Sequence, residues 1–247
     1  IYDTDIYTSE GLPSDYASGS RESNLRSNFD DGVTVEFWLK TGSVADGAIF
    51  PATLTEKQVV FDMWNNVATS SADYGRITIE LSRSVNHLGA PAGTTSPFVL
   101  TVQSGTTGIY TSSIGIGLSA SSLSDWAHYA FVIQNSGSSL VSKLYVDGAL
   151  NHRTASSATL DEINSKGMMG RIGALLSRPS GNVGNLADLA TCGKLSGSVD
   201  EFRFWKVARD SNQIARYYND VVKGGSNTDI SNTTLGLYYK FNEGITT

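Results

Sequence analysis

Cysteine is almost absent from this sequence, since Cys192 is the single one among 247 residues. One cysteine cannot form a disulfide within the chain, so a small secreted domain held together by disulfides is excluded. No histidine and asparagine context accompanies it, which disfavours a catalytic thiol. We expect Cys192 to be a small buried or loop residue.

Charged residues are also few, at 17% of the chain, and acidic ones prevail. The 24 Asp and Glu residues outnumber the 18 Lys and Arg residues, which gives a formal net charge of −6. Without a cluster of basic residues, such a chain repels polyanions on average. The sequence therefore predicts no nucleic-acid partner.

Long apolar runs are missing as well. No stretch approaches the roughly 18 consecutive apolar residues of a membrane span, so we predict no insertion into a membrane. The chain begins at Ile1 without a methionine or a signal peptide. We expect it to be a segment of a longer or processed polypeptide.

The residues that are present favour β-structure. Hydrophobic residues make up 40% of the chain, enough for a sizeable core, and 25 glycines accompany much Ser, Thr and Asn. This composition is typical of many short strands joined by turns. The length fits one large β-domain, and we predict an all-β, antiparallel two-sheet sandwich.

The strongest local signal is a predicted hairpin. The segment 126–133 has apolar residues on both faces, and the segment 144–148 is a strand that runs into Asp147-Gly148. Both central residues of a type I′ turn have positive φ, which Asp-Gly tolerates. Strands of similar pattern are predicted at 33–40, 58–64, 76–82, 98–103, 126–134, 140–147, 149–154, 170–176 and 198–206.

One short helix is predicted near the C-terminus. Asp210 can cap it, and Gln213 three residues later completes a capping box. The residues that follow at helical spacing are Ile214, Tyr217, Tyr218 and Val221. We expect this helix to pack on a sheet edge or an end of the sandwich.

We divide the chain into three parts. Residues 1–30 are polar and irregular, and they pack on the sandwich or lead into it. Residues 31–222 form the β-domain. Residues 223–247 combine a linker rich in Gly, Ser, Asn and Thr with a strand signal, and this strand closes the same sandwich or opens a following domain.

Four segments, followed by the capped helix, resemble one family when they are taken in order. They are Glu-Phe-Trp-Leu-Lys at 36–40, Trp-x-His-Tyr-Ala at 126–130, Leu-Tyr-Val-Asp-Gly at 144–148 and Gly-Ser-Val-Asp-Glu-Phe-Arg-Phe-Trp at 197–205. Together they resemble a LamG-like jelly roll of the concanavalin A-like lectin/glucanase superfamily over residues 30–222. The terminal Tyr-Lys-Phe-Asn-Glu-Gly is similar to segments of virion structural proteins from marine tailed phages.

The resemblance implies two curved antiparallel sheets packed face to face. It also implies ligand binding on the concave sheet or at rim loops, often with calcium. Members of the family include glycan binders, adhesion modules that bind proteins and some hydrolases. The fold alone does not choose among these functions.

Catalytic signatures are not found in the sequence. Hydrolases of this superfamily carry Glu-x-Asp-x-x-Glu or a close variant, and no such run occurs. A retaining glycosidase needs two carboxylates about 5–5.5 Å apart. Asp200-Glu201 and Asp161-Glu162 are adjacent, so we expect the members of each pair to point to opposite faces of a strand. A pair contributed by two strands stays open, and we predict no catalytic residue.

Polar residues on the predicted strands favour structural roles. His128 matches a histidine that the family pattern carries as a structural residue. Glu201 and Arg203 alternate onto one face, where they can pair with each other or with Glu36 and Lys40. We expect a polar network within the sandwich, with ligand contact as the alternative.

The best candidate for ligand binding is the segment between two predicted strands at 62–75. Trp64 and Tyr74 offer flat apolar faces for the C–H side of a sugar ring. Asn65, Asn66 and Asp73 offer planar polar groups for the sugar hydroxyls. The alternative is a turn-rich loop whose aromatic residues cover an end of the sandwich.

Calcium is predicted as a cofactor without an assigned site. A calcium ion needs about six to eight oxygen ligands, and no Asp-x-Asp-x-Asp-Gly loop supplies them. The carboxylates near predicted strand ends are Asp3, Asp5, Asp30, Asp31, Asp73 and Asp125. For each of these, the alternative is a solvated turn residue.

Two long segments, 104–124 and 177–196, are rich in Gly and Ser. Loops of this length in a compact domain are usually functional or contact neighbouring protein. We therefore expect them to pack against neighbouring domains or other copies in a larger assembly.

Three functions are compatible with these observations. The leading hypothesis is a non-catalytic recognition or adhesion module at an extracellular or virion surface, which binds glycan or a cell-surface protein. The second is a structural assembly module of a virion or surface fibre. The third is a glycoside hydrolase of the same superfamily.

Overall fold

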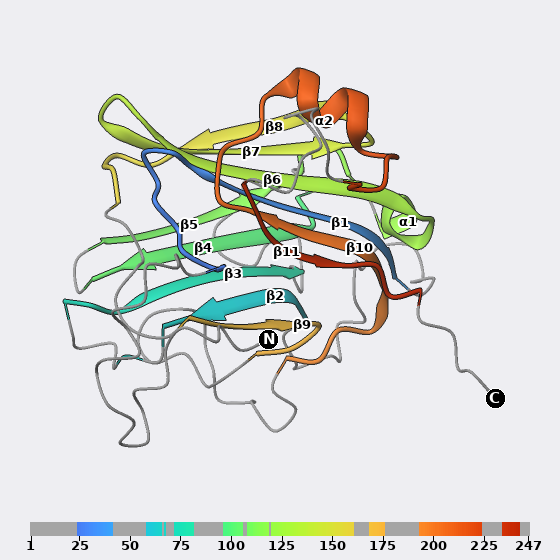
Figure 1. Ribbon diagram of the computed structural model, residues 1–247, viewed down its shortest axis with the longest axis horizontal. Coiled ribbons are helices and arrows are strands. Elements are labelled where there is room, and N and C mark those ends of the chain that lie inside the picture. Colours follow the sequence, from blue (N-terminus) through green and yellow to red (C-terminus); the bar gives the residue numbers. More distant parts are fainter. Residues whose placement is uncertain are drawn as a thin grey trace.

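The computed structural model describes residues 24–41, 58–65, 67, 72–81, 96–105, 108–118, 120–160, 168–175, 193–223 and 234–242. In these parts of the chain, two antiparallel sheets pack face to face (Figure 1). The predicted all-β, antiparallel two-sheet sandwich is therefore confirmed.

Six strands form the larger sheet, in the spatial order β11-β10-β1-β6-β7-β8. Their bounds are Val33–Thr41 (β1), Ala127–Ser136 (β6), Ser139–Val146 (β7), Ala149–Ala155 (β8), Gly197–Trp205 (β10) and Leu235–Tyr239 (β11). Five strands form the smaller sheet, in the order β5-β4-β3-β2-β9. Their bounds are Gln58–Trp64 (β2), Gly75–Leu81 (β3), Phe98–Ser104 (β4), Gly108–Ile114 (β5) and Met169–Ile172 (β9).

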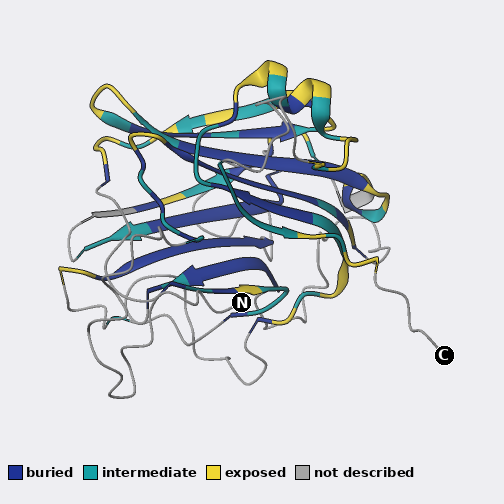
Figure 2. Ribbon diagram, viewed as in Figure 1, coloured by how far each residue is buried: buried dark blue, intermediate teal, exposed yellow. Residues whose placement is uncertain are grey.

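The core lies between the two sheets. Because successive side chains of a strand point to opposite faces, each sheet turns one apolar face toward the core. Phe37 is fully buried at its centre, and its ring centroid lies 6.1 Å from Tyr129 and 6.4 Å from Phe202. Phe61 of the smaller sheet reaches across to Phe202, with the ring centroids 5.0 Å apart. Figure 2 shows the buried strands as a dark blue band through both layers. Aromatic packing of this kind holds the two sheets together.

The predicted hairpin is present, with Phe131 of β6 opposite Leu144 of β7. The turn after β7 has the backbone that its sequence indicated, since φ is +47° at Asp147 and +81° at Gly148. The Asp147 carboxylate also accepts a hydrogen bond from the backbone N–H of His128, at 2.8 Å. The turn is thereby tied to the neighbouring strand β6.

The predicted loop at 104–124 is wrong, because it contains β5 and the short helix α1 (Ala120–Ser124). Tyr110 and Ile114 of β5 face the core, whereas Thr111 and Ser113 pair with the outward residues of β4. Only two apolar side chains mark the inner face of β5. Because the strand is otherwise rich in Ser and Gly, the alternation of apolar and polar residues that indicates a strand is not evident in its sequence. The other predicted loop, 177–196, lies outside the described residues except for 193–196.

Helix α2 (Ser211–Tyr217) begins with the predicted capping box. The N–H of Gln213 donates to the Asp210 carboxylate at 2.8 Å, and the N–H of Asp210 donates to the Gln213 side chain at 3.0 Å. As expected, α2 contacts an edge of a sheet, the strand β8. It also covers part of the outer face of the larger sheet, where Ile214 is buried against Ala130, Val132 and Tyr145. The C-terminal end of the expected apolar stripe, Val221, lies beyond the helix and is exposed.

Strand β11 pairs antiparallel with β10 in the larger sheet, with Arg203 opposite Tyr238. The strand signal near the C-terminus is therefore part of this sheet. Residues 1–23 and 243–247 lie outside the described residues, and the proposed division of the chain into three parts stays a prediction.

The helices in the described parts of the chain are short. None of them combines the length and the apolar character that a crossing of a lipid bilayer requires.

We expect Gly148→Ala to destabilise the domain by about 2–3 kcal/mol. A Cβ atom there would lie 2.9 Å from the Tyr218 ring and 3.0 Å from the Ala215 backbone, and φ is positive. Gly137→Ala is the matched control, because its φ is +62° but a Cβ would meet nothing within 4 Å. Urea unfolding should show a loss of about 1 kcal/mol for the control. Equal losses in the two variants would contradict close packing of α2 on this turn.

Candidate functional site

The predicted ligand-binding segment joins β2 to β3 at one end of the smaller sheet. Trp64 is the last residue of β2, opposite Arg76 of β3 and Met169 of β9, and it is half-buried. Its indole N–H donates to the carbonyl oxygen of Val67 at 3.1 Å, and the guanidinium carbon of Arg76 lies 5.8 Å from the ring centroid. The indole is thus held in one orientation beside a cation.

Asn65 and Tyr74 are buried, so they form the support of this loop. The Asn65 side chain accepts a hydrogen bond from the N–H of Gly75 at 3.0 Å and donates to the carbonyl oxygen of Asp73. Both ends of its amide are therefore occupied within the loop. Tyr74 is 2% exposed, and burial raises the pKa of its hydroxyl, although the adjacent Arg76 partly opposes this shift.

The five predicted ligand-binding residues differ in their exposure to solvent. Asp73 is exposed and Trp64 is half-buried, so their side chains remain accessible to a ligand. Asn65 and Tyr74 are buried, and Asn66 lies outside the described residues. The binding role of this loop stays a prediction.

A buried ion pair that sequence reasoning did not single out lies next to Trp64. Asp62 accepts two hydrogen bonds from Arg76, from Nε to Oδ1 at 2.8 Å and from Nη2 to Oδ2 at 2.6 Å. Thr78 donates a third, to Oδ1 at 2.9 Å. Burial alone would lower the pKa of Arg76, but the Asp62 carboxylate raises it overall. The sequence did contain a signal for this ion pair, namely an acid at an outward position of β2 and a base at an outward position of β3.

A second group of charged residues lies on the opposite side of the molecule, on the outer face of the larger sheet. We call Glu36, His128, Glu201, Arg203 and Arg209 the Glu36 cluster. The Glu36 carboxylate lies 3.5 Å from Arg203 Nη1, 3.3 Å from Arg209 Nε and 3.8 Å from His128 Nε2. Arg203 also meets Glu201 at 3.1 Å, so the predicted pairing of Arg203 with Glu201 and with Glu36 is confirmed. The part of that prediction that involved Lys40 stays a prediction.

The Glu36 cluster is sealed from solvent by aromatic residues. Tyr218 packs on the His128 ring with centroids 5.6 Å apart, and Trp38 packs on it from another side at 5.7 Å. Burial alone would raise the pKa of Glu36, but His128 and the two arginines lower it overall. Because Glu36 is ionised and surrounded by cations, the arrangement favours a structural role for His128 over a catalytic one.

A β-bulge brings Asp200 to the same face of the sheet as Glu201. Glu201 has φ of +48°, and the register of β10 shifts between the pairs Glu36↔Arg203 and Trp38↔Asp200. The side chains of Asp200 and Glu201 consequently both lie on the outer face of the larger sheet, and the expectation that they point to opposite faces is wrong. Glu201 accepts hydrogen bonds from Arg203 and from the Tyr238 hydroxyl, whose pKa is raised to about 12 by burial and by this carboxylate.

The described residues contain no group of three or more His, Cys, Asp or Glu side chains placed to hold a metal ion. Asp30 instead accepts a hydrogen bond from the Asn135 amide at 2.9 Å. Asp3 and Asp5 lie outside the described residues, so calcium stays a prediction.

We expect Glu36→Gln to destabilise the domain at neutral pH by about 3–5 kcal/mol, because two buried arginines lose their carboxylate. The pKa of Glu36 is lowered on folding from its ordinary value of 4.5. The ionised carboxylate therefore stabilises the fold above that pH, and its contribution is lost as the pH falls through the folded pKa.

Urea unfolding over a series of pH values below neutrality measures this effect. The unmodified chain should lose more stability on the acid side than Glu36→Gln does. Asp31→Asn is the matched control, because it removes an exposed carboxylate and should leave the acid-side slope unchanged. Parallel acid-side losses in the unmodified chain and Glu36→Gln would contradict an ionised Glu36.

Comparisons with known proteins agree with this architecture. Residues 14–215 match the Laminin_G_3 family, described as the concanavalin A-like lectin/glucanases superfamily. No curated protein matches the sequence.

Three solved structures illustrate the likeness in fold. The native heptameric SAP-like pentraxin from Limulus polyphemus is 13% identical, with 77% of this chain and 71% of that chain covered and a TM-score of 0.44. Tailspike protein 2 from Escherichia coli O157:H7 bacteriophage CAB120 is 12% identical, with 90% of this chain and 25% of that chain covered and a TM-score of 0.50. Domains LG4-5 of the mouse laminin alpha1 chain are 11% identical, with coverages of 75% and 38% and a TM-score of 0.43.

The match to the family covers most of the chain and includes the hairpin, the Glu36 cluster and the start of α2. This chain therefore belongs to the Laminin_G_3 family of the concanavalin A-like lectin/glucanase superfamily.

Proposed function

We propose that this chain is a non-catalytic recognition module that binds glycan or a surface protein as part of a larger extracellular or virion protein. The observation that carries the proposal is the fixed indole of Trp64 at the end of the smaller sheet. Its N–H is held by Val67, and its ring lies beside Arg76. A flat apolar face next to ordered polar groups is the chemistry that binds a sugar ring.

The partners of two buried acids support a binding role over hydrolysis. Glycoside hydrolysis needs two carboxylates that flank one bond, about 5–9.5 Å apart in the two common mechanisms. The buried acids of the described residues are Glu36 on the larger sheet and Asp62 and Glu80 on the smaller one, and the core separates Glu36 from the other two. The Asp62 carboxylate is engaged by Arg76 and Thr78, and the arginines beside Glu36 help to lower its pKa, which disfavours a proton-donating acid there.

The setting in a larger protein is part of the proposal. The bacteriophage tailspike is an example of this fold within a longer chain, since this chain spans 25% of its length. An extracellular or virion surface would expose the sandwich to glycans, and neighbouring domains or copies would be further partners.

A glycan array, measured with and without EDTA, tests the proposal. We expect a defined subset of glycans to be bound, and binding to no glycan and no surface protein would contradict the proposal. Loss of binding in EDTA that added calcium restores would support the calcium prediction. Binding that EDTA leaves unchanged would remove calcium from it.

We expect Trp64→Ala to weaken glycan binding by about 1–2 kcal/mol, because it removes the aromatic platform of the loop. Isothermal titration calorimetry with the best glycan from the array measures the change. Trp64→Phe is the conservative variant, since it keeps a flat ring but loses the hydrogen bond to Val67, and it should retain part of the affinity. Unchanged affinity in Trp64→Ala, with an unaltered unfolding midpoint, would exclude Trp64 from the site.

A structural assembly module is the second candidate, favoured by one specific feature. Tyr239 and Phe241, near the edge strand β11, are 39% and 45% exposed and stack with centroids 5.9 Å apart. Exposed aromatic pairs of this kind are common at protein interfaces. If this pair mediates assembly, Phe241→Ser should shift the protein toward smaller species in sedimentation velocity and leave glycan binding unchanged.

A further inference from the structure

The outer face of the larger sheet carries a second group of aromatic and charged side chains, beyond the Glu36 cluster. Trp38 of β1 is opposite His128 on one side and Asp200 on the other. The next outward residue of β1, Lys40, is opposite Ser198 of β10. Ala127 of β6 is opposite Leu39 of β1. Because the two strands are antiparallel, the preceding residue Trp126 falls opposite the following residue Lys40.

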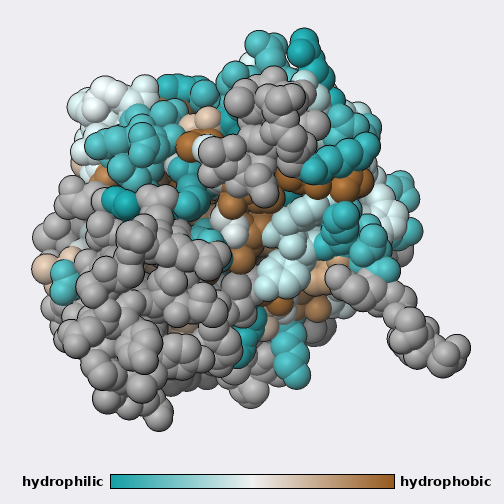
Figure 3. All heavy atoms as spheres, in the orientation of Figure 1, coloured by the Kyte–Doolittle hydropathy of each residue, from teal (hydrophilic) through white to brown (hydrophobic). Residues whose placement is uncertain are grey.

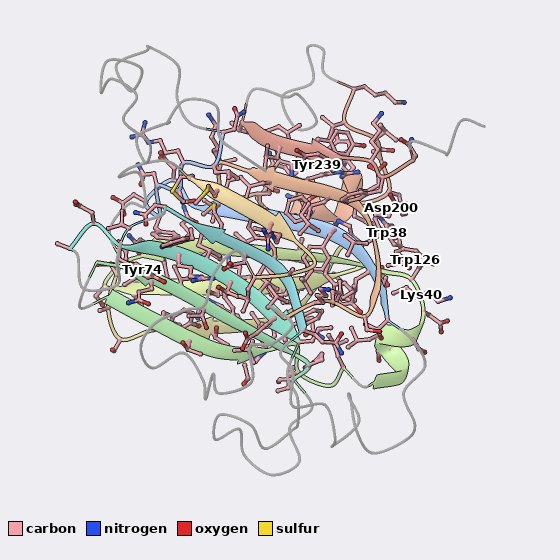
Figure 4. All side chains as sticks on the ribbon, turned by 90° about the horizontal axis from the view of Figure 1, so that it is seen from below. Trp38, Lys40, Tyr74, Trp126, Asp200 and Tyr239 are labelled. Atoms are coloured by element: carbon pink, nitrogen blue, oxygen red, sulfur yellow. The ribbon has the colours of Figure 1, made fainter. Side chains whose placement is uncertain are left out.

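Figure 4 shows Trp38, Lys40, Trp126 and Asp200 gathered at one end of the molecule, far from Tyr74. This group therefore lies apart from the loop between β2 and β3. The two locations belong to different sheets, so a ligand on one does not contact the other.

Trp126 is an exposed indole on a rigid support. It is 46% exposed, whereas Trp205 is 1% exposed. The helix α1 ends two residues before it, and Leu123 of that helix is fully buried. The Thr41 hydroxyl donates to the carbonyl oxygen of Leu123 at 3.0 Å, which ties the helix to the end of β1. The backbone that presents Trp126 is thus fixed from both sides.

Polar groups lie on the next two strands beyond this indole, Lys40 on β1 and Asp200 on β10. Asp200 is oriented because its Oδ1 accepts a hydrogen bond from the N–H of Glu201 at 2.9 Å. Lys40 is exposed, and its position is diagonal to Asp200 across the β1–β10 pair, about 7–8 Å away. Among the residues that the structure describes, no ion pair involves Lys40 or Asp200. A donor and an acceptor therefore remain available to a ligand.

Size and composition favour a sugar over a protein at this location. A stable protein interface buries about 800 Å² on each partner, and its centre is depleted of Lys and Asp. Here one exposed indole is flanked by a lysine and an aspartate. Figure 3 shows hydrophilic atoms over much of the described surface, with apolar atoms in a narrower band below α2.

We propose that Trp126, Lys40 and Asp200 form a second glycan-binding surface. The C–H face of a sugar ring stacks on the Trp126 indole, the Lys40 ammonium donates to one of its hydroxyls, and the Asp200 carboxylate accepts from a hydroxyl of an adjoining sugar unit. This inference rests on the proposed glycan-binding function and adds a site to it.

The four tryptophans of the chain allow the two sites to be distinguished in one experiment. The protein is labelled with 5-fluorotryptophan, and its ¹⁹F spectrum is assigned with Trp126→Ala and Trp64→Phe. Glycans that bind on an array of neutral and acidic oligosaccharides are then titrated into the labelled protein. We expect the resonance of Trp126 to shift, with a dissociation constant that rises about tenfold in Asp200→Asn.

Asp200→Asn keeps an oxygen for the N–H of Glu201, so the bulge should be retained while the charge is lost. Leu150→Ala is the matched control, because it removes an apolar side chain of similar exposure, 54%, from the far strand β8 of the same sheet, and should leave the Trp126 titration unchanged. In Trp126→Ala, the array should lose those glycans that shift only the Trp126 resonance.

The outcomes separate this inference from the proposed function. If bound glycans shift Trp64 but never Trp126, the second surface is overturned and glycan recognition stands. If no glycan binds, both proposals fail as glycan sites. A shift of Trp126 caused only by a surface protein would overturn the assignment of a sugar to this surface.

Discussion

The burial of one aromatic-rich face of each sheet against the other is the constraint on which this structure depends. Phe37 contacts rings from β6 and β10, and Phe61 joins the smaller sheet to the same group. Because side chains alternate along a strand, the inward set also decides which residues must face outward. The outward positions of Trp64, Glu36 and Lys40 follow from that alternation.

The outward-facing charged residues differ in whether other parts of the chain cover them. Where α2 covers the larger sheet, Glu36 is matched by two arginines, since an unmatched buried charge would cost several kcal/mol. Beyond the helix, Lys40 is exposed and Asp200 is half-exposed. The same face of one sheet therefore stabilises the fold at its centre and offers polar groups to a ligand at its end.

The sequence predicted those features that depend on local patterns. The hairpin of β6 and β7, the Asp147-Gly148 turn and the capping box of α2 each have a signal within a few residues, and all three are present. The sequence did not reveal strand β5, because Ser112 interrupts the inner face that Tyr110 and Ile114 mark. Local alternation is a weak guide for an edge strand with so few apolar residues.

Features that depend on partners distant in the chain were predicted less well. The sequence offered Asn65 and Tyr74 as ligand contacts, but pairing of β2 with β3 buries both of them. In the same way, the bulge at Glu201 arises from the register between β10 and β1, which no pattern within β10 shows. The ion pair of Asp62 with Arg76 likewise depends on the pairing of β2 with β3, because the two residues are distant in the chain and meet only when these strands align.

The irregularities of β10 also affect the exposed side of the sheet. This strand shifts register against β1 and again against β11, between Phe204 and Trp205. Bulges increase the local twist, and a strongly twisted edge is a poor template for the addition of another strand. We therefore expect the edge at β11 to resist the addition of a further strand, so that association near this edge would use side-chain contacts such as those of Tyr239.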